Sequence, residues 1–121
     1  MAEAIADLHG FKDGVIVHGD IQLCQYLINR DGQLKLNDFN RAEVMLWDTK
    51  KQDYCRFRSG LVYGNYRSPE EDEDEPLNEQ IDVFSLGKHL ELLRAVDHDS
   101  MYLCFFFKQH TFLCYIEQNN N

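Results

Sequence analysis

One helix in the C-terminal third of the sequence constrains the fold most. Asn78 is a good N-cap for a helix that starts at Glu79. That helix carries apolar residues on nearly all sides, at Ile81, Val83, Phe84, Leu86, Leu90, Leu92 and Leu93. A helix that is apolar all round belongs in the middle of a core. Because little of the chain remains to cover it, we expect the chain to be one piece of a larger fold.

The N-terminal residues predict a helix followed by a strand. Residues 2–9 favour a helix, with Ile5 and Leu8 three positions apart on one face and Gly10 available to end it. Residues 15–17 are all β-branched and predict a short strand.

A hairpin follows, and after it a segment without clear period. Residues 26–28 and 34–36 predict two strands, joined by a turn that contains Asp31-Gly32. Residues 41–67 predict a long loop with one short strand at most, and such a loop is usually functional or mobile. Together the elements predict an α+β chain that is mostly helical.

Composition limits the possible partners. A chain of 121 residues forms one domain at most, and its 44% hydrophobic residues are enough for a core. The net charge of −9 argues against nucleic acid and anionic membranes. Residues 70–75 form one unbroken acidic run, which predicts a solvated loop or, alternatively, a docking patch for a basic partner.

Cysteine usage and the termini favour a soluble cytoplasmic protein. The four cysteines form no C-x-x-C pair and no zinc site, which indicates free thiols in a reducing compartment: Cys24, Cys55, Cys104 and Cys114. The N-terminus lacks the basic region of a signal peptide. The apolar run at residues 101–107 is shorter than the roughly 20 residues that span a bilayer.

Two aspartates are candidates for chemistry. Asp20 follows a predicted strand, and Asp38 follows the predicted hairpin. Each aspartate taken alone is typical of a turn, since Asp side chains often bond their own backbone. His18 alone is typical of a structural histidine, and Phe39 of a core residue.

The order and spacing of four motifs change that interpretation. His18-Gly19-Asp20 is followed by Asp38-Phe39-Asn40, then Ser68-Pro69-Glu70, then a helix with Asp82-Val83-Phe84-Ser85-Leu86-Gly87. The set resembles the C-terminal lobe of the eukaryotic protein kinases, with its H-R-D-x-x-x-x-N, D-F-G and A-P-E motifs and a buried helix. The resemblance covers residues 1–94, without the N-terminal lobe, and leaves residues 95–121 unassigned.

The resemblance implies roles for the polar residues in ATP- and Mg²⁺-dependent phosphoryl transfer. Asp20 would accept the proton of the substrate hydroxyl, and Asp38 would hold Mg²⁺, which prefers hard oxygen ligands. Leu27 and Asn37 would belong to the nucleotide site.

The resemblance also implies structural roles. His18 and Phe39 would support the site. Glu70 would form an ion pair with an arginine further along the chain. Asp82 would hold the backbone of the catalytic loop.

Four residues depart from the family pattern. Gly19 replaces an arginine, Gln22 the catalytic-loop lysine, Gln25 the metal-binding asparagine, and Asn40 the glycine of D-F-G. Losing one charge-stabilising donor typically costs about 2.7–4 kcal/mol, or roughly 10²–10³ in rate. We therefore expect weak phosphoryl transfer or none, although Gln22 and Gln25 stand at the catalytic and metal positions.

Three functions remain open. The first is a protein kinase acting on Ser, Thr or Tyr of a protein; because the chain has no G-x-G-x-x-G loop, it would need a separately supplied N-terminal lobe. The second is a non-catalytic pseudokinase module that binds a partner protein. The third is a small-molecule phosphotransferase of the aminoglycoside or choline type, because His18-Gly19-Asp20 is close to the H-G-D of those enzymes.

Overall fold

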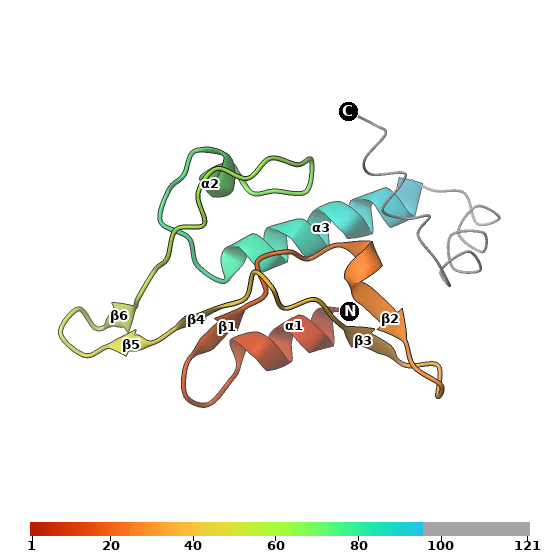
Figure 1. Ribbon diagram of the computed structural model, residues 1–121, viewed down its shortest axis with the longest axis horizontal. Coiled ribbons are helices and arrows are strands. Elements are labelled where there is room, and N and C mark those ends of the chain that lie inside the picture. Colours follow the sequence, from red (N-terminus) through yellow and green to blue (C-terminus); the bar gives the residue numbers. More distant parts are fainter. Residues whose placement is uncertain (96–121) are drawn as a thin grey trace.

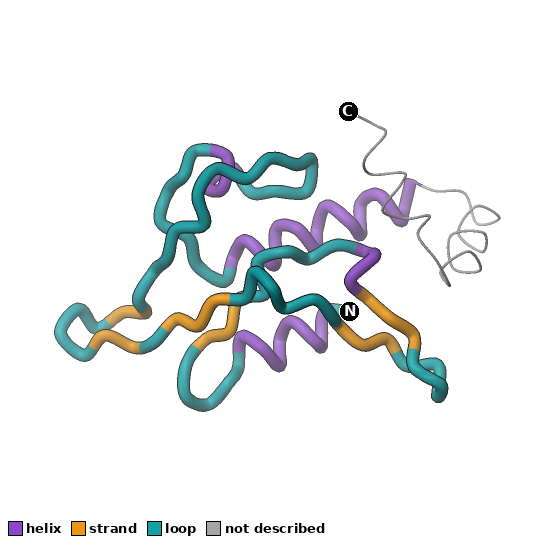
Figure 2. Tube along the Cα trace, viewed as in Figure 1, coloured by secondary structure: helices purple, strands orange, loops and turns teal. Residues whose placement is uncertain are grey.

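The computed structural model describes residues 1–95, which form a small α+β domain (Figures 1 and 2). Its helices are α1 (Ala2–His9), the 3₁₀ turn η1 (Leu23–Gln25), α2 (Pro69–Asp72) and α3 (Gln80–Ala95). Its strands are β1 (Val15–Val17), β2 (Tyr26–Ile28), β3 (Leu34–Leu36), β4 (Glu43–Met45), β5 (Trp47–Asp48) and β6 (Asp53–Tyr54). Within residues 1–95 only α1 and α3 exceed four residues, so the expectation of a mostly helical chain is not confirmed.

The strands pair as three separate two-stranded antiparallel sheets. The pairs are β1–β4, β2–β3 and β5–β6. Figure 1 shows the β5–β6 and β2–β3 hairpins on opposite sides of the domain, with α1, β1 and β4 between them.

The first four predicted elements are confirmed at the expected residues: the helix at 2–9 and the strands at 15–17, 26–28 and 34–36. Gly10 does end α1, but at φ −89°, so the helix stops without a left-handed residue. In the hairpin, Gly32 takes φ +78°, and Asn29 Oδ1 accepts a hydrogen bond of 2.9 Å from the Gln33 N–H. The Asp31-Gly32 signal therefore predicted the turn correctly.

The prediction for residues 41–67 is wrong in part, because this segment contains three short strands. β4 pairs with β1, with Val15 opposite Met45 and Val17 opposite Glu43. Met45 is the single buried residue of β4. A strand of three residues with one buried side chain is too short to show the alternation of apolar and polar residues that predicts a strand.

Within the described residues α3 is covered on one side only, as expected for an apolar helix with little chain left to cover it. Its buried residues include polar ones: Ile81, Asp82, Ser85, Leu86 and His89. Val83, Leu90 and Leu92 are nearly half-exposed. Burial of the polar residues is possible because each has a hydrogen-bond partner; Ser85 Oγ, for example, donates to the Tyr66 carbonyl at 2.8 Å. α3 begins at Gln80, one residue later than predicted, and Asn78 Oδ1 accepts a hydrogen bond of 2.9 Å from the Gln80 N–H.

The acidic run at residues 70–75 is not wholly a solvated loop. α2 begins at Pro69, and Glu71 is buried at 1% exposure. Glu71 Oε2 accepts a hydrogen bond of 2.9 Å from the Ser68 N–H at the start of α2. A carboxylate at a helix N-terminus satisfies an otherwise unpaired amide, so the run includes a helix start.

Two apolar clusters form the core, and α3 contributes to both. One contains Val15, Val17, Met45, Leu77 and Ile81. The other contains Ile5, Ile21, Tyr26 and Leu86, with Leu34 and Leu36 packed against it. The loop between β1 and β2, which carries Asp20, therefore lies between helix α3 and the β2–β3 hairpin.

Two further sequence expectations concern membranes and thiols. Within residues 1–95 no helix combines the length and apolar character needed to cross a membrane. Cys55 is an exposed free thiol, and the Cys24 thiol donates to Gln22 Oε1 at 3.6 Å. Cys104, Cys114, the apolar run at 101–107 and the tail from residue 96 lie outside the described residues.

Candidate functional site

The loop after β1 is fixed by a carboxylate on α3. Asp82 Oδ2 accepts a hydrogen bond of 2.7 Å from the His18 N–H, and Asp82 Oδ1 accepts one of 2.9 Å from the Gly19 N–H. His9 Nε2 on α1 also lies 3.0 Å from Asp82 Oδ2. His18, Gly19 and Asp82 are buried, so Asp82 satisfies loop amides that are shielded from water.

His18 links this loop to the segment after β3. The Asp20 N–H points to His18 Nδ1 at 3.3 Å, which requires that Nδ1 carry no proton. Nε2 therefore holds the proton and donates to the Asn37 carbonyl at 2.9 Å. The ring of Phe39 packs edge-on against His18, with ring centroids 4.9 Å apart. His18 thus joins the Asp20 loop to the Asp38 loop.

Gly19 has a conformation that explains the absence of a side chain there. Its φ is +72°, and an added Cβ would lie 2.7 Å from the Arg41 carbonyl oxygen. A side chain at this position would meet both backbone strain and a clash.

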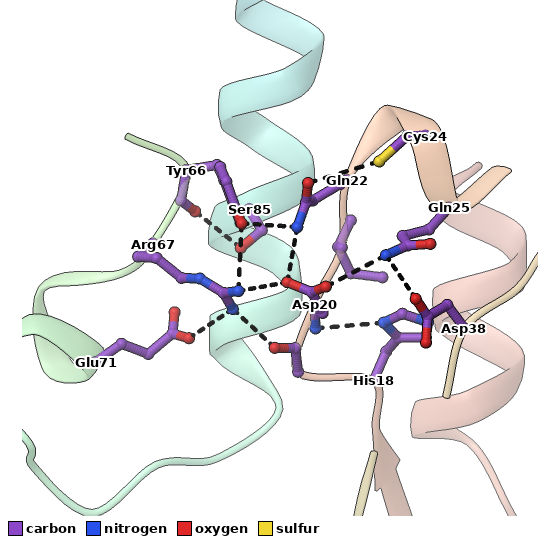
Figure 3. Close-up of polar contacts among 12 residues, drawn as sticks. His18, Asp20, Gln22, Cys24, Gln25, Asp38, Tyr66, Arg67, Glu71 and Ser85 are labelled. Carbon is purple, nitrogen blue, oxygen red and sulfur yellow. Dashed lines mark hydrogen bonds and ion pairs between the residues drawn. The ribbon is translucent and has the colours of Figure 1, made fainter. Parts of the chain in front are cut away.

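The Asp20 carboxylate is surrounded by donors (Figure 3). Its Oδ1 accepts a hydrogen bond of 2.9 Å from Gln22 Nε2 and forms an ion pair with Arg67 Nη2. Its Oδ2 accepts a longer contact of 3.3 Å from Gln25 Nε2. The two carboxylate oxygens are therefore unequal, because Oδ1 has two donors and Oδ2 has one weak donor.

Gln25 connects the two sequence-predicted aspartates. Its Nε2 lies 3.3 Å from Asp20 Oδ2 and 3.2 Å from Asp38 Oδ2. Because both acceptors are carboxylate oxygens, the amide nitrogen must face them. Asp38 itself takes φ +61°, a left-handed conformation that Asp tolerates better than most residues. The structure thus brings Asp20 and Asp38 to the two sides of one amide group.

The remaining predicted site residues lie nearer the surface. Leu27 on β2 and Phe39 are about half-exposed, so Phe39 is not the core residue that its type alone suggests. Asn37 is exposed and uses its backbone carbonyl toward His18. Glu70 is exposed and forms no ion pair within residues 1–95; its neighbour Glu71 is the buried carboxylate.

Three residues that the sequence did not single out complete the site: Tyr66, Arg67 and Glu71. Arg67 Nη1 donates to Glu71 Oε1 at 3.1 Å. The Tyr66 hydroxyl accepts from Gln22 Nε2 at 2.7 Å and from Arg67 Nη2 at 3.3 Å. A signal was present, since Arg67 and Glu71 stand at the (i, i+4) spacing of helical ion pairs.

Two titratable groups around the site have shifted pKa values. Burial alone would lower the pKa of Arg67, but the charges of Tyr66, Asp20 and Glu71 outweigh burial and raise it. Burial lowers the pKa of His89, and the Ile21 carbonyl and the charge of Asp20 offset this only in part. Arg67 is therefore a permanent cation beside Asp20, and His89 is a neutral donor beneath the loop, with Nε2 3.0 Å from the Ile21 carbonyl.

The Asp38 carboxylate can serve a hard cation, because Mg²⁺ prefers oxygen ligands. Gln25 would add its amide oxygen only after rotation of the amide, since its nitrogen faces Asp20 and Asp38. No three His, Cys, Asp or Glu side chains in the described part of the chain are grouped to hold a metal by themselves. The residues therefore fit an ion that takes its other ligands from nucleotide phosphates and water, as Mg²⁺ usually does in phosphoryl transfer.

Comparison with known proteins identifies relatives of the chain, although no protein-family model matches it. It is 33% identical over 84 residues to the probable serine/threonine-protein kinase nek2 of Dictyostelium discoideum, covering 69% of this chain and 19% of that protein. It is 33% identical over 86 residues to the serine/threonine-protein kinase Nek1 of Mus musculus, covering 71% of this chain and 7% of the relative. A PTI1-like tyrosine-protein kinase of Arabidopsis thaliana is 32% identical over 92 residues, which cover 76% of this chain and 25% of the relative.

The chain spans a quarter or less of the length of these relatives. The relatives are protein kinases, and the matches extend over about 70% of this chain. Together they support a kinase-like domain in this chain, and with it a protein kinase family relationship.

Proposed function

We propose that residues 1–94 correspond to the C-terminal lobe of a protein kinase domain, and that the 121-residue chain on its own transfers phosphate from ATP to protein hydroxyls weakly or not at all. The family relationship suggests the reaction. The observation that carries the proposal is the Gln25 amide, which contacts Asp20 Oδ2 and Asp38 Oδ2 at once. The two carboxylates that the reaction needs are thereby held together.

The two carboxylates would have different roles in the reaction. Asp20 Oδ2, with one weak donor, is the oxygen left to accept the proton of a substrate hydroxyl. Asp38, with the Gln25 amide oxygen after rotation of the amide, would hold Mg²⁺. The magnesium nucleotide, when bound, supplies the phosphoryl group. Leu27, half-exposed on β2, offers an apolar surface for the adenine ring of the nucleotide.

The weakness of the reaction follows from the neutral side chain at Gln22. Positive charge near the transferring group stabilises the transition state. Gln22 Nε2 instead donates to Asp20 Oδ1 and to the Tyr66 hydroxyl. Because the amide carries no charge and is already engaged, it contributes little to phosphate stabilisation.

Ligand-dependent unfolding tests the nucleotide site. The midpoint of thermal unfolding of the 121-residue chain would be measured with and without Mg-ATP, for the original sequence, Asp38→Ala and the control Asp13→Ala. Binding to the folded state stabilises it by about 2.7 kcal/mol at a ligand concentration a hundred times the dissociation constant. We expect a rise in the original chain and in Asp13→Ala, which changes an exposed residue, but none in Asp38→Ala. No rise in any of the three would contradict the nucleotide site.

A phosphoryl-transfer assay tests the predicted rate. Transfer from ATP to a mixed Ser/Thr/Tyr peptide pool would be compared between the original chain and Asp20→Ala. We expect slow transfer or none, and Asp20→Ala should abolish any transfer that the original chain shows. Fast transfer by the isolated chain would show that the neutral Gln22 is not limiting. Phosphoryl transfer that persists in Asp20→Ala would show that Asp20 is not the proton acceptor.

A non-catalytic partner-binding module is the second candidate function. The rings of Trp47 and Tyr54 form an edge-on pair, with centroids 5.1 Å apart, on the projecting β5–β6 hairpin (Figure 1). Both side chains are exposed, and aromatic residues are enriched at protein interfaces. Capture of a partner that is unchanged by Asp20→Ala and Asp38→Ala but lost in Trp47→Ser would favour this function. The same capture would show whether a separate N-terminal lobe is that partner.

A further inference from the structure

We infer that Arg67 is a positioning residue for Asp20, which fixes the carboxylate so that Oδ2 alone is available to a substrate hydroxyl. The inference rests on the proposed function, because it assigns a role within the Asp20 site. Asp20 and Arg67 are 47 residues apart in the sequence, so only the folded chain brings them together.

Arg67 uses all four hydrogens of its terminal nitrogens on fixed acceptors. Nη1 donates to the Gly19 carbonyl at 2.8 Å and to Glu71 Oε1 at 3.1 Å. Nη2 forms the ion pair with Asp20 Oδ1 and donates to the Tyr66 hydroxyl at 3.3 Å. The guanidinium also lies over the Tyr66 ring, 4.7 Å from its centroid. Its orientation is therefore set from several directions at once.

This arrangement makes the two oxygens of Asp20 chemically different. Oδ1 receives both Arg67 Nη2 and Gln22 Nε2, as Figure 3 shows. Rotation of the carboxylate would break a charge-assisted bond, the stronger class of hydrogen bond. Oδ2 stays on the side of Gln25 and Asp38, where a bound nucleotide would lie.

Burial shows that Arg67 acts through Asp20 and not on a ligand. The side chain of Arg67 is 4% exposed, against 15% for Asp20. A guanidinium that is covered in this way and has its terminal hydrogens engaged cannot reach a phosphate group. Lysine offers one ammonium in place of the planar fork, so it cannot serve the Gly19 carbonyl, Asp20 and Tyr66 in this geometry.

The test must separate positioning from folding, because removal of Arg67 alone leaves the buried Glu71 carboxylate without its cationic partner. The double variant Arg67→Met/Glu71→Gln removes both charges and leaves an amide oxygen to accept from the Ser68 N–H. Arg67→Lys keeps the positive charge but removes the planar guanidinium group. Arg58→Met is the matched control, since Arg58 is an exposed arginine of the same segment, paired with Asp74.

The direct readout is the χ1 angle of Asp20 in the isotope-labelled 121-residue chain, from three-bond couplings between the backbone and Cγ. The original chain and Arg58→Met are expected to show one rotamer, and the double variant and Arg67→Lys an average of several. Retention of one rotamer in a folded double variant would overturn the inference. This readout needs neither nucleotide nor activity.

The second readout is phosphoryl transfer, with kcat and the KM for ATP measured separately. A misplaced reacting group can cost roughly 10² in rate, so we expect kcat to fall about that far in the double variant while KM for ATP is kept. An unchanged or increased kcat, with Asp20 rotating, would overturn the inference, and an increase would show that the ion pair blocks Asp20. If the original chain transfers no phosphate, the rotamer measurement alone decides whether Arg67 fixes Asp20, and the effect of Mg-ATP on thermal unfolding tests the proposed function separately.

Discussion

The Asp82 carboxylate on α3 accepts a hydrogen bond of 2.7 Å from the His18 N–H, 64 residues earlier in the sequence. The other carboxylate oxygen binds the next amide, that of Gly19, at 2.9 Å. One side chain thus fixes two successive backbone amides directly before Asp20. The position of Asp20 depends on α3 as well as on its own strand.

Replacement of Asp82 is expected to destabilise the fold strongly. Asp82→Ala leaves two buried N–H groups without acceptors, at about 1–3 kcal/mol each. We expect a loss of about 2–6 kcal/mol in the free energy of unfolding, measured by urea denaturation. Asp82→Asn retains one acceptor oxygen and should lose less. The control Asp13→Ala alters an exposed carboxylate and should change stability little. Equal stability of Asp82→Ala and the control would contradict the anchoring role.

Local chemistry made the first half of the fold predictable from the sequence. The helix at residues 2–9 and the strands at 15–17, 26–28 and 34–36 depend on neighbouring residues, through β-branching and the Asp31-Gly32 turn. β4 was missed because its structure depends on pairing with β1, thirty residues away at Val15 and Met45. Three residues carry too little periodicity to predict a non-local pairing.

The site was predictable only in part, for a similar reason. Motif spacing pointed to Asp20 and Asp38, and the structure joins them through Gln25. The (i, i+4) spacing of Arg67 and Glu71 could indicate that pair, but the contact of Arg67 with Asp20, 47 positions away, leaves no spacing pattern. Likewise, α3 was predicted from apolar residues, whereas its buried side also carries His89, whose partner, the Ile21 carbonyl, lies in the distant Asp20 loop.

Glycine substitutions are expected to separate backbone strain from steric clash. Gly19 and Gly32 have similar φ values of +72° and +78°, but an added Cβ meets the Arg41 carbonyl at 2.7 Å only at Gly19. A left-handed alanine costs roughly 1–2 kcal/mol. Gly32→Ala should lose about that much, and Gly19→Ala should lose a further 1–3 kcal/mol or so from overpacking, both measured by urea denaturation.

Gly87 provides the opposite control. It lies inside α3 with nothing within 4 Å of an added Cβ and no positive φ. Gly87→Ala should therefore stabilise the chain by about 0.5–1 kcal/mol. Equal losses at Gly19 and Gly32 would show that the backbone near Arg41 yields to the added methyl group.

Stability should fall in mild acid because of His89. Burial lowers the pKa of His89 from its ordinary 6.5. Below pH 6.5 the unfolded chain therefore binds a proton at this residue that the folded chain does not bind. The contribution of His89 is present above that pH and is lost as the pH falls.

The measurement is the urea midpoint at a series of pH values from neutral downward. His89→Gln keeps a donor for the Ile21 carbonyl but does not titrate, so its midpoint should fall less steeply. The same slope in both would show that His89 does not contribute.

Stability should also fall in alkali because of Tyr26 on β2. Burial, and after it the charge of Asp82, raises the pKa of Tyr26 from 10.0 to about 12. Between these values the unfolded chain has lost the phenolic proton and the folded chain has kept it, so stability present below pH 10 is lost as the pH rises. Two pH units correspond to about 2.7 kcal/mol at most.

Tyr26→Phe should remove this alkaline loss. The Tyr26 hydroxyl is buried and has no hydrogen-bond partner among residues 1–95, so its removal should leave stability at neutral pH unchanged or slightly higher. Tyr63→Phe, at an exposed tyrosine, is the control and should keep the loss. Urea midpoints at neutral and alkaline pH measure both effects. A broken hydrogen bond costs about 1 kcal/mol. If Tyr26→Phe loses that much stability at neutral pH, the Tyr26 hydroxyl has a hydrogen-bond partner in solution. Burial would then not be the main cause of its raised pKa.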